Sequence, residues 1–199
     1  MKALLVRLFG IVTITCALAF ARQAHAASGN NLQTFSGTTA QSPDFQGYGG
    51  TSTLIGDGCA RLNTMTIVTA KGAFAGVYIS PSLPGKPIGN LNKLSFTYHV
   101  EAGSGAALYL AVPIDANSDG HYDAFAFIRS TGCNKATAID GVVDLDCPVE
   151  FDGTYQNWAA FAAAHPDYRF GSDTEPFVNA VGPFIGTVCN VQFGRASAK

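Results

Sequence analysis

A nine-residue run near the middle of the chain constrains the fold more than any other feature, because its polar pattern interrupts two apolar patterns. Apolar residues alternate from Leu108 to Ile114 before the run and at Phe125 and Phe127 after it. A period of two is typical of β-strands. Within the run, oxygen-bearing side chains precede and follow Gly120, at Asp115, Asn117, Asp119 and Asp123. The sequence therefore predicts a β-hairpin with this run at its tip.

The chemistry of the run favours a calcium site. Calcium takes six to eight oxygen ligands, and a tight loop supplies them from acidic positions around a turning glycine. The backbone carbonyl of His121 stands at relative position 7, where such loops use a main-chain oxygen. The alternative is an ordinary turn without metal, since Asp, Asn and Gly are also the residues that turns prefer. The predicted ligands are Asp115, Asn117, Asp119, His121 and Asp123.

The spacing D-x-N-x-D-G-x-x-D resembles the calcium loops of EF-hands, dockerin repeats, thrombospondin type 3 repeats and FG-GAP propeller blades. It departs from the EF-hand at position 12, where Ala126 replaces the bidentate glutamate, and its flanks are strands instead of helices. A single copy argues against a dockerin or a propeller, because both repeat the motif. The resemblance implies an ion and no reaction.

The N-terminus has the pattern of a secretory signal over residues 1–26. Lys2 and Arg7 precede an apolar run from Leu8 to Phe20, and Ala24-His25-Ala26 forms a small-residue cleavage site. That run is shorter than a membrane span, and no later segment approaches the length of one. We therefore expect residues 27–199 to form a single secreted or periplasmic domain with no membrane insertion.

Net charge argues against nucleic acid as a partner. Removal of the signal takes away Lys2, Arg7 and Arg22 and leaves nine basic residues against 14 acidic ones, a net charge of −5. The remaining basic residues are scattered singly. Binding to a phosphate backbone needs clustered Lys and Arg, so this class of function is disfavoured.

Four cysteines remain once Cys16 leaves with the signal. In an oxidising compartment an even number favours two disulfides, and three pairings are formally possible. Cys133 and Cys147 bracket a short segment, so we expect them to pair, which leaves Cys59 to join Cys189. Zinc is the competing use, and the absence of any C-x-x-C pair disfavours it.

The wider pattern predicts a mostly β chain, a two-sheet antiparallel sandwich of jelly-roll type with one short helix at about 155–164. We expect a hairpin of 62–70 with 74–80 through the turn Lys71–Ala73, and a half-buried strand in which apolar residues alternate from Leu94 to Val100. Asp152 or Thr154 would cap the helix and Pro166 would end it. In the last strand Cys189, Val191 and Phe193 are predicted to share one face.

From residue 94 to residue 194 the order of elements is similar to that of secreted bacterial β-sandwich domains without settled activity. A strand enters the D-x-N-x-D-G-x-x-D hairpin, a W-x-x-F helix ends in H-P-D-Y, and a final strand has the pattern N-V-x-F-G. The resemblance implies a fold and an ion.

The function favoured by these features is a secreted, calcium-stabilised binding module for a carbohydrate or another cell-surface polymer. Exposed aromatic rings stack on sugars, and Tyr122 beside the loop is the first candidate for ligand contact. The other aromatic candidates are Tyr48, Tyr155, Trp158 and Tyr168. Trp158 is more typical of the core.

Two other classes of function stay open. One is an extracellular glycoside hydrolase or lyase that uses two of Glu101, Glu150 and Glu175. The other is a structural or adhesive surface protein. A Ser-His-Asp hydrolase is disfavoured because the chain has no G-x-S-x-G elbow and only His99 lacks an evident structural role. The acidic segment Asp140–Asp152 is interpreted as a solvated face or a second weak cation site.

Overall fold

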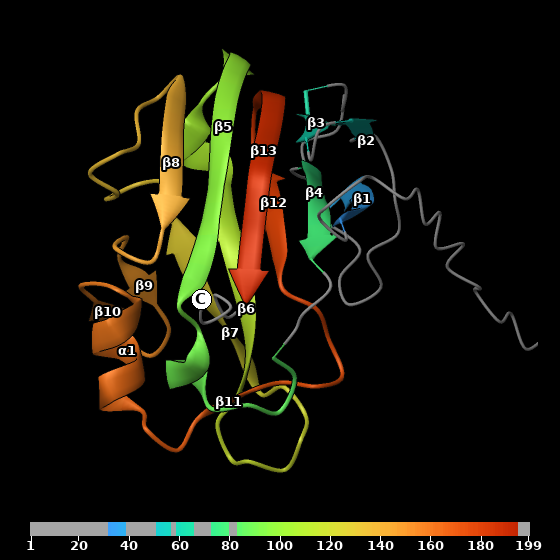
Figure 1. Ribbon diagram of the computed structural model, residues 1–199. Coiled ribbons are helices and arrows are strands. Elements are labelled where there is room, and N and C mark those ends of the chain that lie inside the picture. The colour runs from blue at the N-terminus through green and yellow to red at the C-terminus, as the bar shows by residue number, and fades with distance from the viewer. Residues whose placement is uncertain (1–31, 39–50, 57–58, 66–72, 80–82, 195–199) are drawn as a thin grey trace, which may run out of the picture.

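The computed structural model describes residues 32–38, 51–56, 59–65, 73–79 and 83–194, and the predicted signal peptide lies outside these residues. The described chain forms two antiparallel β-sheets in two layers, with a short helix beside them (Figure 1). This confirms a mostly β protein with a sandwich-like arrangement. The jelly-roll topology stays a prediction.

One layer, called sheet A, has eight strands. Seven follow the spatial order β1-β4-β12-β6-β7-β9-β10, and the eighth, β11, pairs with β6. Their bounds are β1 Leu32–Thr38, β4 Ala73–Ile79, β6 Leu108–Asp115, β7 Ala124–Arg129, β9 Val149–Glu150, β10 Thr154–Tyr155, β11 Arg169–Phe170 and β12 Phe177–Val181.

The other layer, sheet B, has five strands in the order β2-β3-β13-β5-β8. Their bounds are β2 Thr51–Gly56, β3 Cys59–Asn63, β5 Lys93–Gly103, β8 Asp140–Asp144 and β13 Phe184–Gly194. Two short 3-10 helices, η2 Ile88–Asn90 and η3 Gly105–Ala107, precede β5 and β6.

The core lies between the two sheets. The alternating residues of β5 face inward as predicted, with Leu94 at 3% exposed and Phe96 at 0%. From the opposite layer, Leu110, Val112 and Ile114 of β6 complete the contact. Burial of these apolar faces is the main favourable term holding the layers together.

The helix α1 spans Trp158–Ala164 and begins three residues later than predicted. Its N-cap is Asn157, whose side-chain oxygen accepts a hydrogen bond of 2.8 Å from the N–H of Ala160. The predicted caps Asp152 and Thr154 were wrong because Thr154 and Tyr155 form strand β10 and pair with β9. Trp158 is buried as expected, at 2% exposed.

The predicted hairpin of 62–70 with 74–80 is also wrong. β3 pairs with β2 and β13 in sheet B, whereas β4 pairs with β1 and β12 in sheet A. β3 and β4 are consecutive strands of the described chain but belong to different layers, and residues 66–70 of the first predicted strand lie outside the described residues. Their turn at Lys71–Ala73 includes residues outside the described part of the chain.

A β-bulge changes the inward residues of β13. The pairing with β5 shifts between Cys189 and Gln192, and Asn190 has a φ of 53°. As a result Val188 and Val191, three positions apart, are both buried, while Cys189 and Phe193 are only half-buried. The expectation that Cys189, Val191 and Phe193 share one face was therefore wrong for Cys189, whereas Phe193 pairs with the inward residue Leu94 and packs against the core.

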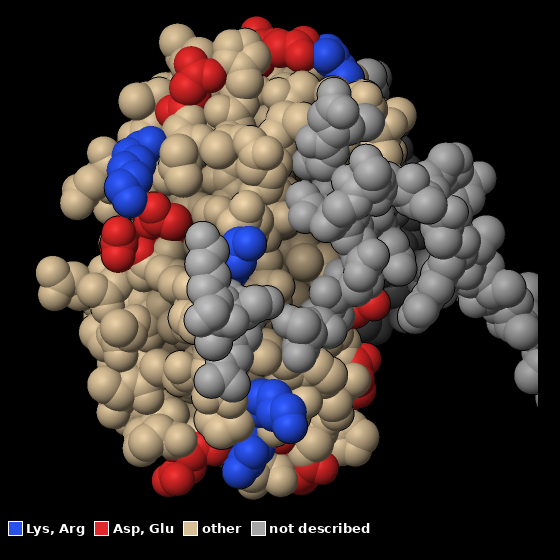
Figure 2. All heavy atoms as spheres, in the orientation of Figure 1, with Lys and Arg blue, Asp and Glu red and all other residues tan. Residues whose placement is uncertain are grey.

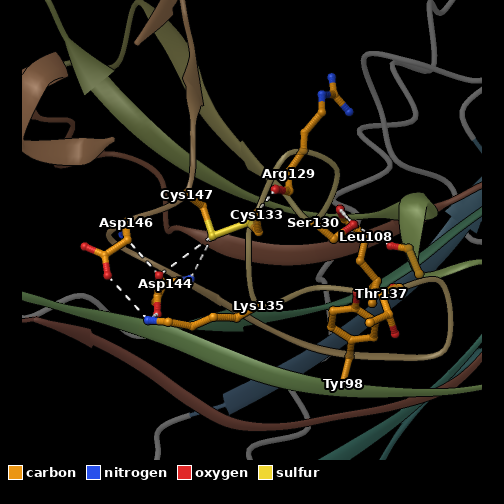
Figure 3. The surroundings of a disulfide bond; sticks show 11 residues. Tyr98, Leu108, Arg129, Ser130, Cys133, Lys135, Thr137, Asp144, Asp146 and Cys147 are labelled. Atoms are coloured by element: carbon orange, nitrogen blue, oxygen red, sulfur yellow. Dashed lines mark hydrogen bonds and ion pairs between the residues drawn. A yellow bond between two sulfur atoms is a disulfide. The ribbon is translucent and has the colours of Figure 1, made fainter. Parts of the chain in front are cut away.

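Both expected cysteine pairs are joined. Cys59 and Cys189 face each other across the neighbouring strands β3 and β13. Cys133 and Cys147 close the segment between β7 and β9 (Figure 3). Within the described residues, no helix is long and apolar enough to cross a membrane.

Candidate functional site

The predicted calcium loop lies at the tip of the β6–β7 hairpin, as expected. Ile114 and Ala124 are the last paired residues, and the N–H of Asp123 donates to the carbonyl of Ile114 at 2.8 Å. The chain thus leaves and re-enters sheet A at paired positions, which holds the two ends of the loop together.

Asp115 is the acidic side chain at the base of the loop, and it is fully buried at 0% exposed. Its two carboxylate oxygens accept hydrogen bonds from the N–H groups of Asp119 at 3.2 Å and Gly120 at 2.9 Å. Gly120 has a φ of 93°, a conformation that side chains other than glycine rarely adopt. This explains the glycine at the sixth position of the run.

The other oxygen-bearing side chains also turn into the loop. The Asn117 oxygen accepts from the N–H of Asp119 at 2.9 Å, and an Asp119 oxygen accepts from the N–H of His121 at 2.9 Å. Asp123 reaches back and accepts from the N–H of Ala116 at 2.8 Å. All four side chains therefore accept hydrogen bonds from backbone N–H groups between residues 116 and 121.

This donor set has the chemistry of a calcium site. A carboxylate offers about four lone-pair positions, and hydrogen bonds within the loop occupy two on Asp115, one on Asp119 and three on Asp123, where Asn117 donates from both its backbone and its side chain. Among the described residues, no three His, Cys, Asp or Glu side chains gather closely enough to hold a metal by themselves. A cation here would therefore also need the Asn117 amide oxygen and the His121 carbonyl.

The segment after β11 supports the loop, and the sequence analysis did not identify it. Asp173 accepts hydrogen bonds from the N–H of Tyr122 at 2.9 Å and from the His121 ring at 3.1 Å. Ser172 donates to the carbonyl of Gly120. Asp173 lies 51 positions from Tyr122, so no local sequence signal could have paired them.

The His121–Asp173 contact alters both ionisations. The hydrogen bond and the charge of Asp173 raise the pKa of His121 above its ordinary value. Desolvation opposes ionisation of Asp173, but hydrogen bonds from Tyr122 and His121 outweigh it and lower the pKa of the carboxyl group. Both groups therefore favour their charged forms, and they hold the second half of the loop against the segment after β11.

Tyr122, the predicted ligand-contact residue, is exposed at 41%. Its ring lies 4.9 Å from that of Phe125, the second residue of β7. The loop thus presents one aromatic ring to solvent at the end of sheet A.

The other aromatic candidates serve the helix region. Tyr155 donates a hydrogen bond to Asp152 at 2.6 Å and lies 2.7 Å from the Nε2 atom of His165. The hydrogen bond to Asp152 raises the pKa of Tyr155 to about 12. His165 in turn stacks on Tyr168. The remaining aromatic candidate, Tyr48, lies outside the described residues.

The structure does not bring the candidate carboxylates Glu101 and Glu150 together as a pair. Glu101 of β5 lies in sheet B and binds Arg61, whereas Glu150 of β9 lies in sheet A and binds Arg129 at 2.7 Å. Glu175 lies just before β12, and its charge contributes to a raised pKa of Tyr78 after the larger effect of burial.

His99, which had no evident role in the sequence, contacts Asp140 across the β5–β8 pair at 2.5 Å. In the rest of the acidic segment, Lys135 binds Asp144 at 2.7 Å and Asp146 at 3.4 Å, next to the Cys133–Cys147 disulfide (Figure 3). The Lys135 ammonium thus offsets part of the negative charge of the segment that was predicted to hold a second cation.

Comparison of the chain with protein-family models, curated proteins and solved structures gives no match. Inferences about function therefore rest on the residues and contacts of this chain alone.

Proposed function

We propose that this protein is a secreted, calcium-stabilised binding module whose ligand is a carbohydrate or another cell-surface polymer. The observation that carries the proposal is the geometry of the hairpin loop. Its four oxygen-bearing side chains accept hydrogen bonds from N–H groups of the same loop, and Tyr122 is exposed to solvent. The two disulfides agree with an oxidising compartment.

The ion would be held by the side chains of Asp115, Asn117, Asp119 and Asp123 with the carbonyl of His121. Calcium in such a loop supplies positive charge that offsets the repulsion among the carboxylates. Without a glutamate at the twelfth position the loop has fewer charged ligands than a sensor loop, so the affinity should fall in the extracellular range of about 10⁻⁴–10⁻³ M. The ion would then stabilise the hairpin and would not act as a signal.

Thermal unfolding tests the calcium site. At a concentration about 100 times the dissociation constant, calcium should add about 2.7 kcal/mol to the free energy of unfolding, which is several degrees in Tm. Chelation should reverse this gain in the wild type and leave the Asp119→Ala variant unmoved, because that variant lacks a central ligand.

Asp140→Ala is the matched control, because it also removes an exposed carboxylate but lies in sheet B opposite His99. It should keep the full response to calcium. Equal melting curves for the wild type in calcium and in chelator would show that the run is an ordinary turn. A glycan array probed in calcium tests the ligand, and an absence of binding there would remove the carbohydrate from the proposal.

A further inference from the structure

The outer side of sheet A has its own layer of aromatic rings. Neighbouring strands place side chains on the same face where residues pair, and the pairs Tyr109 with Arg129, Ala111 with Phe127 and Pro113 with Phe125 join β6 to β7. Phe177 of β12 pairs with Ala111 from the other side. The core residues of β6 occupy the alternate positions and point between the sheets. These rings therefore lie on the side of sheet A that faces away from sheet B.

The rings touch one another in a continuous series. Their centroids lie 4.9 Å apart for Tyr122 and Phe125, and 6.3 Å apart for Phe125 and Phe127. Phe177 flanks Phe125 at 5.3 Å, and Tyr109 flanks Phe127 at 5.4 Å. We call these five residues the aromatic face. It follows β7 and begins at the calcium loop.

Polar groups complete one end of the aromatic face. The Arg129 guanidinium lies 5.4 Å from the centroid of the Tyr109 ring and 5.5 Å from that of Phe127. Arg129 also binds Glu150, and these two side chains are 39% and 46% exposed. Because the pair is neutral overall, this end offers hydrogen-bonding groups without a net charge.

Asn179 fixes the Tyr109 ring from beneath the aromatic face. It pairs with Tyr109 across β12 and β6, and its amide nitrogen donates to the Tyr109 hydroxyl at 2.7 Å. Asn179 is 3% exposed, and none of the described residues bonds to its buried side-chain oxygen. Because Asn179 is buried, its role is to hold the Tyr109 hydroxyl in place, and it does not contact a ligand on the surface.

The outer side of sheet B differs in kind. Its exposed side chains include the ion pairs of Arg61 with Glu101 and of His99 with Asp140. Figure 2 shows this side of the molecule with acidic and basic groups scattered over it. The aromatic face is thus specific to one side of the sandwich. Within it Tyr122 is exposed at 41%, Tyr109, Phe125 and Phe127 are half-buried, and Phe177 is buried, so the accessible part of the aromatic face follows β7.

The size of the aromatic face selects its occupant. From β12 to β7 it spans two strand spacings, about 10 Å, and along β7 from the loop to Arg129 it runs about 20 Å. The resulting area of roughly 200 Å² is far below the ~800 Å² per partner of a standard protein interface. A narrow chain lying lengthwise fits these dimensions, whereas a second copy of this protein does not.

We propose that the aromatic face binds an extended, uncharged polysaccharide chain that lies along β7 from Tyr122 to Arg129. Sugar rings present apolar C–H faces, which stack on Tyr122, Phe125 and Phe127, and hydroxyl groups, which match the polar groups at Arg129 and Glu150. This inference rests on the proposed function and assigns its binding site and class of ligand. It also places one stacking ring, Tyr122, between two proposed calcium ligands.

Affinity electrophoresis of the mature chain in calcium tests the site, with hydroxyethylcellulose, xylan and galactomannan as uncharged probes and polygalacturonate as the charged one. We expect an uncharged probe to retard the wild type, and Phe127→Ala and Tyr122→Ala each to weaken binding about tenfold, the equivalent of a lost stacking contact. His99→Ala, which removes an exposed ring from sheet B, is the matched control and should bind as the wild type does.

The outcomes separate this inference from the proposed function. Retardation of the wild type with equal binding by both aromatic variants would overturn the site and leave the function standing. Retardation only by polygalacturonate would overturn the uncharged ligand. If no probe retards the wild type, the carbohydrate ligand and the site fail together. A wild-type dimer that Phe127→Ala converts to a monomer in sedimentation would show that a second copy occupies the face. If Phe127→Ala fails to fold, Tyr122→Ala still tests the site, because Tyr122 is exposed and its ring is not part of the core.

Discussion

Single residues fix the shape of the hairpin loop. Asp115 is fully buried and bonds two backbone N–H groups, while Asp173 holds the N–H of Tyr122 from a distant segment. Gly171 allows that segment to approach, since a Cβ atom there would lie 2.6 Å from the Cβ of Tyr122. The position of Tyr122 therefore depends on the absence of a side chain at residue 171.

Gly171→Ala should lower the free energy of unfolding by about 1–3 kcal/mol, because the added methyl group meets the backbone of the loop as well as its side chain. Urea denaturation measures the loss. Gly153→Ala is the matched control, since a Cβ atom there meets nothing within 4 Å, and its effect should stay within about 0.5 kcal/mol. Equal stability of the two variants would contradict this account of the loop.

At the scale of elements, β6 is buried on both faces, which is unusual for a strand of an antiparallel sheet with one side turned outward. Its inward residues meet sheet B, and its outward residues Ala111 and Pro113 lie on the side that carries the rings of the aromatic face. The strand is thus held from two sides at the position where it enters the loop.

The helix provides a second test at this scale. Asn157→Ala should cost about 1 kcal/mol of stability, because the first turn of α1 loses the acceptor for the N–H of Ala160. Thr154→Ala should cost less than about 0.5 kcal/mol, since Thr154 is an exposed strand residue with no capping role. Chemical denaturation of the two variants compares them. A larger loss of stability for Thr154→Ala than for Asn157→Ala would show that Thr154 caps the helix and that the helix begins earlier.

For the whole molecule, the two disulfides constrain the chain on very different scales. Cys59 and Cys189 are 130 positions apart, whereas Cys133 and Cys147 are 14 apart. The first ties the beginning of the described core to its last strand, and the second closes one connection.

In the chain-entropy model, a disulfide stabilises by restricting the unfolded state, by about 3 kcal/mol for a 15-residue loop and about 5 kcal/mol for one above 100 residues. Paired serine substitution at Cys59 and Cys189 should therefore destabilise the protein more than paired substitution at Cys133 and Cys147. Urea denaturation at neutral pH gives both values. The reverse order would show that native packing around the shorter loop outweighs the entropy of the longer one.

Features that depend on local spacing could be predicted from the amino-acid sequence. A period of two placed β5, β6 and β7, the run from Asp115 to Asp123 marked the hairpin tip, and the short spacing of Cys133 and Cys147 indicated their disulfide. Contacts between distant segments became evident only from the folded chain. It separated β3 from β4, set Asp173 against Tyr122 and gathered the aromatic face from β6, β7, β12 and the loop. This difference arises because strand periodicity assigns a face to each side chain, whereas the neighbours on that face depend on pairing between segments far apart in the chain.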